Sequence, residues 1–107
     1  MLKEVKLALG KVKNDYDAEL AGLILAAVGD LGIVDVTASG VTLVINQDGT
    51  VTDSSTITDQ LLIRAIITYV RLNFKSPEDY DKLKRSYDEQ KAQLITATGY
   101  GLPAEVV

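Results

Sequence analysis

The sequence predicts a mainly α-helical protein: a small helical bundle of three to four helices with a β-hairpin insert between the second and third helices. Two observations support this fold class. Apolar residues recur at helical spacing in separate segments, and between two of those segments the pattern changes to the alternation that is typical of strands. At 107 residues the chain suits one hydrophobic core. We therefore expect a single helical domain over residues 1–98, followed by a flexible C-terminal tail over residues 99–107.

The first two helices are expected in the first third of the chain. Apolar residues within residues 2–9 suggest a short helix or turn. Asn14 or Asp15 then offers an N-cap, because a side-chain oxygen there can accept from the free N–H groups of a first helical turn. Apolar residues follow at helical spacing until Gly32, so we expect the second helix over residues 16–31.

A stripe of small residues runs along the second helix at intervals of four, four and three residues: Ala18, Gly22, Ala26 and Gly29. Glycine inside a helix costs up to about 1 kcal/mol relative to alanine, so two glycines on one side suggest that another backbone comes close. Two interpretations follow. The first is packing against another helix of the same chain, and the second is contact with a neighbouring subunit.

The hairpin insert is expected at about residues 40–53. Residues 41–46 are rich in β-branched side chains that alternate between the two faces of a strand. Asp48 and Gly49 form a turn signal, and residues 50–52 can return along the first strand. Because an isolated two-stranded hairpin is only marginally stable in water, this one must lean on the helices or on another chain.

Residues 58–74 predict the central helix. Apolar side chains surround most of its circumference, and a helix that is apolar nearly all round is buried. Only Arg64, Thr68 and Arg71 leave a narrow polar strip at helical spacing. We therefore place this helix at the centre of the core, or of a core that a second subunit completes.

The next helix is predicted to begin with Ser76 as its N-cap. Pro77 then occupies the first helical position, and Asp79 completes a capping-box arrangement. Oppositely charged residues at three- or four-residue spacing, Lys84 and Asp88 among them, can pair on the solvent side. The packing seam of this helix consists of Tyr80, Leu83, Tyr87 and Leu94.

Composition excludes several classes of function. The net charge of −4 argues against a protein that neutralises many phosphates. The chain has no cysteine and no histidine, which removes disulfides, thiolate nucleophiles and the commonest zinc ligands, so we expect no metal and no cofactor. The first residues lack the apolar centre of a secretory signal, and no apolar run is long enough for a bilayer, so we expect a cytosolic protein with no membrane partner.

Catalytic groups do not converge in this sequence. Most carboxylates fall at helix starts or at ion-pair spacing, where capping and solvation explain them. No glycine-rich phosphate loop follows a strand, and residues 46–50 lack the ligand ladder and the closing glutamate of a calcium loop. With no pair of nucleophile and base, we expect no enzymatic activity.

A small helical DNA-binding regulator of phage origin is the alternative function, because several short helices can build a helix-turn-helix. The last helix offers Lys82, Lys84, Arg85 and Lys91 for such a role. Acidic residues are interleaved among these basic ones and cancel the local field, so phosphate would gain little there. Sequence-specific DNA binding is therefore the less favoured interpretation.

The order of the elements and three sequence blocks resemble the small head-tail connector proteins of tailed bacteriophages, which are often labelled DNA-packaging proteins. The blocks are YDAELAGLILAAVGDLGI, LLIRAIITYVRLNF and SPEDYDKLKRSYDEQKAQLITATGY. The resemblance extends from Lys3 to about Tyr100, and its last block is the most specific part. Residues 34–55, which contain the hairpin insert, are the least family-like region.

The resemblance implies a non-enzymatic helical adaptor that assembles as a homo-oligomeric ring below the portal protein. Such rings are typically dodecameric in the virion, extend the channel through which DNA passes, and join the DNA-filled head to neck or tail components. An acidic chain suits such a channel, because like charge repels the phosphates and DNA is not bound sequence-specifically. The implied location is the virion neck, with the host cytoplasm before assembly.

Subunit or partner contacts are expected at nine residues. The small-residue stripe and the surplus apolar surface suit lateral packing between copies, and a closed ring requires a heterologous interface. The aromatic residue between two glycines near the C-terminus is where we expect a contact that forms only in the assembled particle. The candidate interface residues are Ala18, Gly22, Ala26, Gly29, Arg64, Arg71, Thr98, Gly99 and Tyr100.

Overall fold

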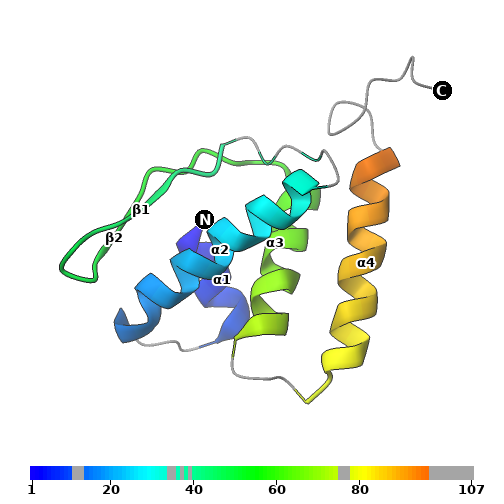
Figure 1. Ribbon diagram of the computed structural model, residues 1–107, viewed down its shortest axis with the longest axis horizontal. Helices are drawn as coiled ribbons and strands as arrows, with labels where there is room; N and C mark the ends of the chain where they lie inside the picture. The colour runs from blue at the N-terminus through cyan, green and yellow to red at the C-terminus, as the bar shows by residue number, and fades with distance from the viewer. Residues whose placement is uncertain (11–13, 34–35, 37, 39, 75–77, 97–107) are drawn as a thin grey trace.

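The computed structural model describes residues 1–10, 14–33, 36, 38, 40–74 and 78–96, and within these ranges it confirms the expected fold class (Figure 1). The elements in chain order are α1 (Leu2–Leu9), the 3-10 turn η1 (Asn14–Tyr16), α2 (Asp17–Ile33), β1 (Leu43–Ile45), β2 (Val51–Asp53), α3 (Gln60–Asn73) and α4 (Tyr80–Thr96). None of the described helices has both the length and the apolar character that a membrane span requires.

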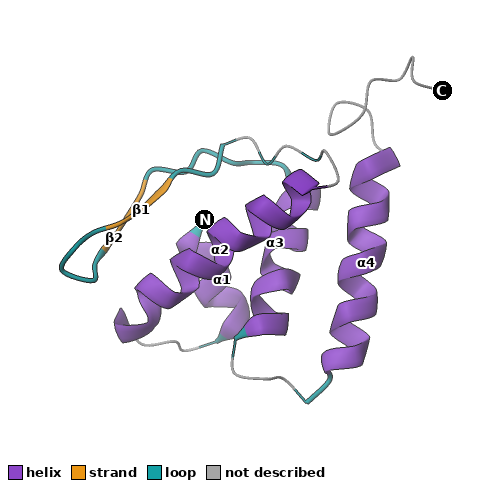
Figure 2. Cartoon of the chain, viewed as in Figure 1, coloured by secondary structure: helices purple, strands orange, loops and turns teal. Residues whose placement is uncertain are grey.

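α3 is the central helix, as predicted. The helices α1, α2 and α4 all pack against it, and the hairpin lies outside this bundle (Figure 2). Asp59 caps α3, because its Oδ1 accepts from the backbone N–H groups of Leu61 at 3.0 Å and of Leu62 at 3.4 Å. Ile66 and Val70, in the middle of the helix, are completely buried. The core residues around α3 are therefore buried within one subunit.

The polar strip on α3 differs from the prediction. Arg64 and Arg71 are exposed, but Thr68 between them is only 8% exposed. Its hydroxyl donates to the carbonyl oxygen of Arg64 at 2.9 Å, so the polar atom is satisfied within the helix and the methyl group can pack in the core. The prediction that Thr68 belongs to the solvent-facing strip is therefore wrong.

α2 matches its predicted position, with small differences at both ends. The 3-10 turn precedes it, so the helix begins at Asp17. The Asn14 side-chain oxygen accepts from Lys6 Nζ at 2.6 Å and so connects to α1. At the other end the helix continues through Gly32 to Ile33, because a single glycine costs too little helix propensity to end it.

One face of the hairpin packs against α2. Leu43 on that face is 8% exposed, whereas Val44, its neighbour on the opposite face, is 53% exposed. The strands are antiparallel, with Leu43 opposite Asp53. In the turn, Gly49 adopts a φ of 86° and donates its N–H to the Asn46 carbonyl at 3.0 Å, which explains why a glycine follows Asp48. The hairpin prediction is confirmed.

α4 begins later than predicted. Its first residue is Tyr80, and Leu83 N–H donates to the Asp79 carbonyl at 3.0 Å. The predicted cap residues Ser76 and Pro77 lie outside the described residues, as does the tail predicted at residues 99–107. The predicted seam is confirmed at Leu83, Tyr87 and Leu94, all of which are buried; the prediction for Tyr80 is wrong, because it is 47% exposed at the helix start.

The start of α1 is tied to the second strand by a contact that the sequence did not reveal. The Met1 ammonium group donates to Asp53 Oδ2 at 2.7 Å, and the Leu2 N–H donates to the same oxygen at 2.8 Å. Glu4 Oε2 lies 3.1 Å from the ammonium nitrogen. These bonds join segments that are 51 and 52 residues apart in the sequence, so they fix the hairpin relative to α1.

We expect Asp53→Asn to lower the free energy of unfolding by about 1 kcal/mol at pH 7, the value of a charge-assisted hydrogen bond discounted for partial exposure. Partial burial opposes ionisation, but hydrogen bonds from Met1, Ser55 and Leu2 outweigh it and hold the pKa of Asp53 well below its ordinary value. Because the folded pKa is depressed, the stabilisation is complete above the unfolded pKa of about 3.9 and is lost as the pH falls toward the folded value. Urea unfolding of both proteins between pH 7 and pH 2 checks this; a difference that stays constant would contradict it.

Candidate functional site

The outward side of α2 carries an uncharged surface, which we call the α2 outer face. It combines the small-residue stripe with two exposed apolar side chains, Leu25 at 41% and Ile33 at 80% exposure. Its members recur at helical spacing: Ala18, Gly22, Leu25, Ala26, Gly29 and Ile33. A solvated helix face normally carries polar side chains, so this surface has the composition of a contact surface.

The first interpretation of the small-residue stripe, packing inside the chain, is wrong for its glycines. Outside the neighbouring backbone of α2 itself, a Cβ atom added at Gly22 or at Gly29 would meet no atom of the described residues within 4 Å. No backbone among the described residues therefore comes close to these two positions. Contact with a neighbouring subunit stays a prediction.

We expect Gly29→Ala to raise the free energy of unfolding of the isolated chain by roughly 0.5 to 1 kcal/mol, because alanine is the better helix former and its methyl group meets open space. Thermal unfolding of both proteins at equal concentration measures this difference. A lower melting temperature for the variant would mean that another part of the subunit lies against Gly29.

The other candidate interface residues lie elsewhere. Arg64 and Arg71 are exposed on α3, and neither takes part in an ion pair with the described residues. Thr98, Gly99 and Tyr100 lie outside the described residues. The nine candidates are thus divided between two helices and the C-terminal segment, and their common role in an interface stays a prediction.

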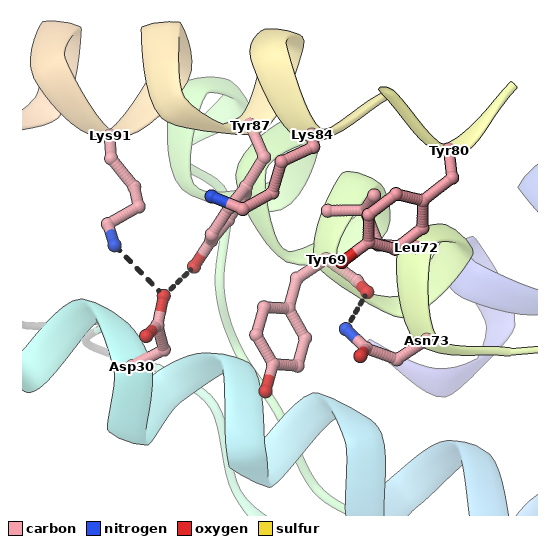
Figure 3. Close-up of a pocket in the computed structure, with 8 residues that line it drawn as sticks. All are labelled: Asp30, Tyr69, Leu72, Asn73, Tyr80, Lys84, Tyr87 and Lys91. Atoms are coloured by element: carbon pink, nitrogen blue, oxygen red, sulfur yellow. Dashed lines mark hydrogen bonds and ion pairs between the residues drawn. The ribbon is translucent and has the colours of Figure 1, made fainter. Parts of the chain in front are cut away.

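A cleft between α2, α3 and α4 is built from residues that the sequence analysis did not select (Figure 3). Its volume is about 170 Å³. Three tyrosines and two lysines contribute most of its wall, and we call it the α4 cleft. The lining residues are Asp30, Tyr69, Leu72, Asn73, Tyr80, Lys84, Tyr87 and Lys91.

Asp30 at the end of α2 holds one side of the α4 cleft together. The Tyr87 hydroxyl donates to Asp30 Oδ2 at 2.6 Å, and Lys91 Nζ donates to the same oxygen at 3.1 Å (Figure 3). The Lys91 ammonium also lies 5.3 Å from the centre of the Tyr87 ring, and the Tyr69 ring packs edge-on against Tyr87 at 5.4 Å. This network connects α4 to α2 and α3.

The network shifts two pKa values in opposite directions. Burial opposes ionisation of Asp30, but hydrogen bonds from Tyr87 and Lys91 outweigh it and lower the pKa of Asp30. Burial, followed by the hydrogen bond to Asp30, raises the pKa of Tyr87 well above its ordinary value. At neutral pH Asp30 is therefore a carboxylate and Tyr87 a neutral hydrogen-bond donor.

The remaining lining residues of the α4 cleft carry further hydrogen-bond donors. Lys84 Nζ pairs with Asp88 Oδ1 at 2.7 Å on the half-exposed surface of α4. The hydroxyl groups of Tyr69 and Tyr80 make no hydrogen bond to the described residues. A group that enters the cleft therefore meets an ammonium group and phenolic hydroxyls, which favour an acceptor such as a carboxylate.

The α4 cleft has the chemistry of a binding surface. Its buried hydroxyl, on Tyr87, already donates to Asp30 and has a raised pKa, so it does not provide a nucleophile. Among the described residues, no three acidic side chains lie close enough together to hold a metal ion. One signal for the cleft was present in the sequence: Asp30 is an isolated charge near the end of an apolar helix, and Tyr87 and Lys91 are four residues apart.

Comparison with known proteins gives one match. The family model described as "Phage connector protein" matches residues 1–101, which include the α2 outer face and the α4 cleft. No curated protein and no solved structure matches the chain.

Proposed function

Because the chain belongs to the phage connector protein family, a family of structural virion components, we propose that it joins the DNA-filled head of a tailed bacteriophage or prophage to the neck or tail. In this proposal the protein forms a ring, dodecameric in the virion, below the portal protein. It acts by assembly and catalyses no reaction. The family match over residues 1–101 is the observation that carries the proposal.

The α2 outer face supports the assembly step. An uncharged helix side with Leu25 and Ile33 exposed gains free energy when another surface covers it. Two glycines on that side leave room for a partner helix to approach closely. A closed ring with one subunit type needs a heterologous interface, so the partner surface in the next subunit is a different one.

The charge of the chain supports its proposed position around DNA. With 15 acidic and 11 basic residues, the protein attracts DNA too weakly to retain it. The basic residues of α4 do not form a continuous patch, because Lys84 and Lys91 are paired with Asp88 and Asp30. DNA can therefore move through the channel of the proposed ring without sequence-specific binding.

Electron microscopy of the purified chain, alone and mixed with the portal protein of the same phage, tests the proposal. We expect rings on the portal vertex, and light scattering gives the number of copies. A mobility-shift assay with duplex DNA over a range of salt concentrations tests the alternative, a DNA-binding regulator. A dimer that binds one DNA sequence tightly, with an affinity that falls steeply with salt, would overturn the proposed function.

A further inference from the structure

The molecule has a projecting element on one side and a hollow on the other. The hairpin extends beyond the helices on the side opposite to α4 (Figure 1). The α4 cleft opens beside α4. A surface that projects and a surface that recedes at different places on one chain can join identical copies head to tail, which is the heterologous contact that closes a ring.

The size of the α4 cleft indicates what it can hold. Its volume of about 170 Å³ is below the roughly 300 to 1,000 Å³ of small-molecule sites, and suits one or two protein side chains. Two of the three charged side chains that line it are lysines. The third, Asp30, already accepts from Tyr87 and Lys91, which leaves Lys84 and the hydroxyl groups of Tyr69 and Tyr80 to bind an incoming acceptor.

The hairpin tip carries a matching group. Asp48 is exposed at the turn, and its Oδ1 accepts from the Thr50 N–H at 3.1 Å and from the Thr50 hydroxyl at 2.6 Å. These two bonds hold the side chain in one orientation, and the second carboxylate oxygen makes no hydrogen bond to the described residues. Asp48 is also the single charged residue of the turn segment 46–50.

We propose that the hairpin tip of one copy enters the α4 cleft of the next copy, with the Asp48 carboxylate accepting from the Lys84 ammonium and the Tyr80 hydroxyl. The proposal rests on the proposed function for its ring geometry, and it names the contact between neighbours. The chain supplies both surfaces, and their charges are complementary. Lys84 can change partner easily, because its present pair with Asp88 is an exposed pair within one helix and such pairs are weak.

Disulfide trapping tests this contact directly, because the natural chain has no cysteine. One preparation carries Gln47→Cys and a second carries Asn73→Cys, so that Asp48, Lys84 and Tyr80 all stay in place. The two are mixed and oxidised at high protein concentration, with Gln60→Cys as the matched control. Asn73 lines the cleft from α3, whereas Gln60 is exposed on the same helix but does not line the cleft. We expect the Gln47–Asn73 mixture to give a mixed dimer in clear excess over the Gln47–Gln60 mixture; equal yields overturn the proposal.

A charge cycle gives a second readout. Asp48→Asn keeps the oxygen that accepts from Thr50, and Lys84→Gln keeps most of the side-chain stem. Each of these two changes is expected to weaken self-association by roughly threefold to tenfold. The double variant is expected to associate no more weakly than either single variant. Lys82→Gln, at an exposed position of α4 that does not line the cleft, is expected to have no effect. Effects of Asp48→Asn and Lys84→Gln that simply multiply in the double variant would overturn the pairing.

The outcomes separate this inference from the proposed function. Rings on the portal without the trapped mixed dimer would overturn the hairpin contact and leave the connector function standing. The trapped mixed dimer without rings would support the contact between copies and overturn the ring.

Discussion

Gly29→Leu is expected to leave the isolated subunit folded and to abolish assembly of the proposed ring. In the described part of the subunit, a side chain at this position enters open space, because no atom beyond the neighbouring backbone of α2 lies within 4 Å of an added Cβ. Leucine is also the better helix former by up to about 1 kcal/mol. In the proposed ring, the same side chain would separate two helices that a glycine lets approach, and overpacking of this kind costs about 1 to 3 kcal/mol. The cost recurs at every interface of the ring.

Two measurements are needed for this prediction. Thermal unfolding reports whether the subunit keeps its stability, and electron microscopy with the portal protein reports assembly. Ala92→Leu is the matched control, since Ala92 is exposed on α4 and does not line the α4 cleft. Normal rings from the Gly29→Leu protein would show that the α2 outer face is not part of the interface. A loss of subunit stability would show that this side of α2 packs against another part of the subunit.

The elements of this fold could be predicted because each rests on short-range patterns. The spacing of apolar residues locates α2 and α3, and the alternation before Asp48 and Gly49 locates the hairpin. The ends of the helices were predicted less accurately, because capping depends on which hydrogen-bond partner each side chain has in the folded chain. Asn14 illustrates this, since its side chain bonds to Lys6 of the preceding helix.

The candidate site could be predicted only in part, because it depends on contacts between distant segments. The small-residue stripe was found, but only the structure could show that the other described residues leave Gly22 and Gly29 uncovered. The α4 cleft depends on Asp30 and Tyr87, which are 57 residues apart. Periodicity reports which side of a helix is apolar and says nothing about which helix faces it.

Thr68 and Tyr80 show how local chemistry can change what a pattern indicates. Periodicity assigned Thr68 to the polar strip, but its hydroxyl donates a hydrogen bond to a carbonyl of the preceding helical turn and can therefore be buried away from water. The spacing of Tyr80 fits the seam of α4, yet its position in the first turn leaves it half exposed at the edge of the cleft. The exposure of both residues could be predicted only from the geometry of the helical bundle.

Asp30→Leu is expected to lower the free energy of unfolding by about 2 to 3 kcal/mol. The Tyr87 hydroxyl would lose its acceptor on a residue that is only 3% exposed, and an unsatisfied buried donor costs about 1 to 3 kcal/mol. The loss of the bond to Lys91 adds less, because that pair is partly exposed. Urea unfolding at pH 7 measures the difference.

The conservative variant Asp30→Asn separates the hydrogen bond from the charge. Its amide oxygen can still accept from Tyr87, so we expect a loss of about 1 kcal/mol. Asp88→Asn, which changes an exposed pair within α4, should cost less than about 0.5 kcal/mol. A cycle with Tyr87→Phe then isolates the pair, because the two changes should not add if the hydroxyl acts mainly through Asp30. Additive losses would contradict that role.

The pH dependence follows from the two pKa shifts of the same pair. The pKa of Asp30 is lowered in the fold, so its contribution is complete above the unfolded value of about 3.9 and is lost as the pH falls through the folded value. The pKa of Tyr87 is raised, so its contribution is complete below the unfolded value of about 10 and is lost as the pH rises toward the folded value. The destabilisation by Asp30→Leu should therefore be largest between these limits and shrink at both ends. Since α4 depends on this pair for its connection to α2, the same variant should also weaken any contact that uses the α4 cleft, whereas Asp30→Asn should preserve it.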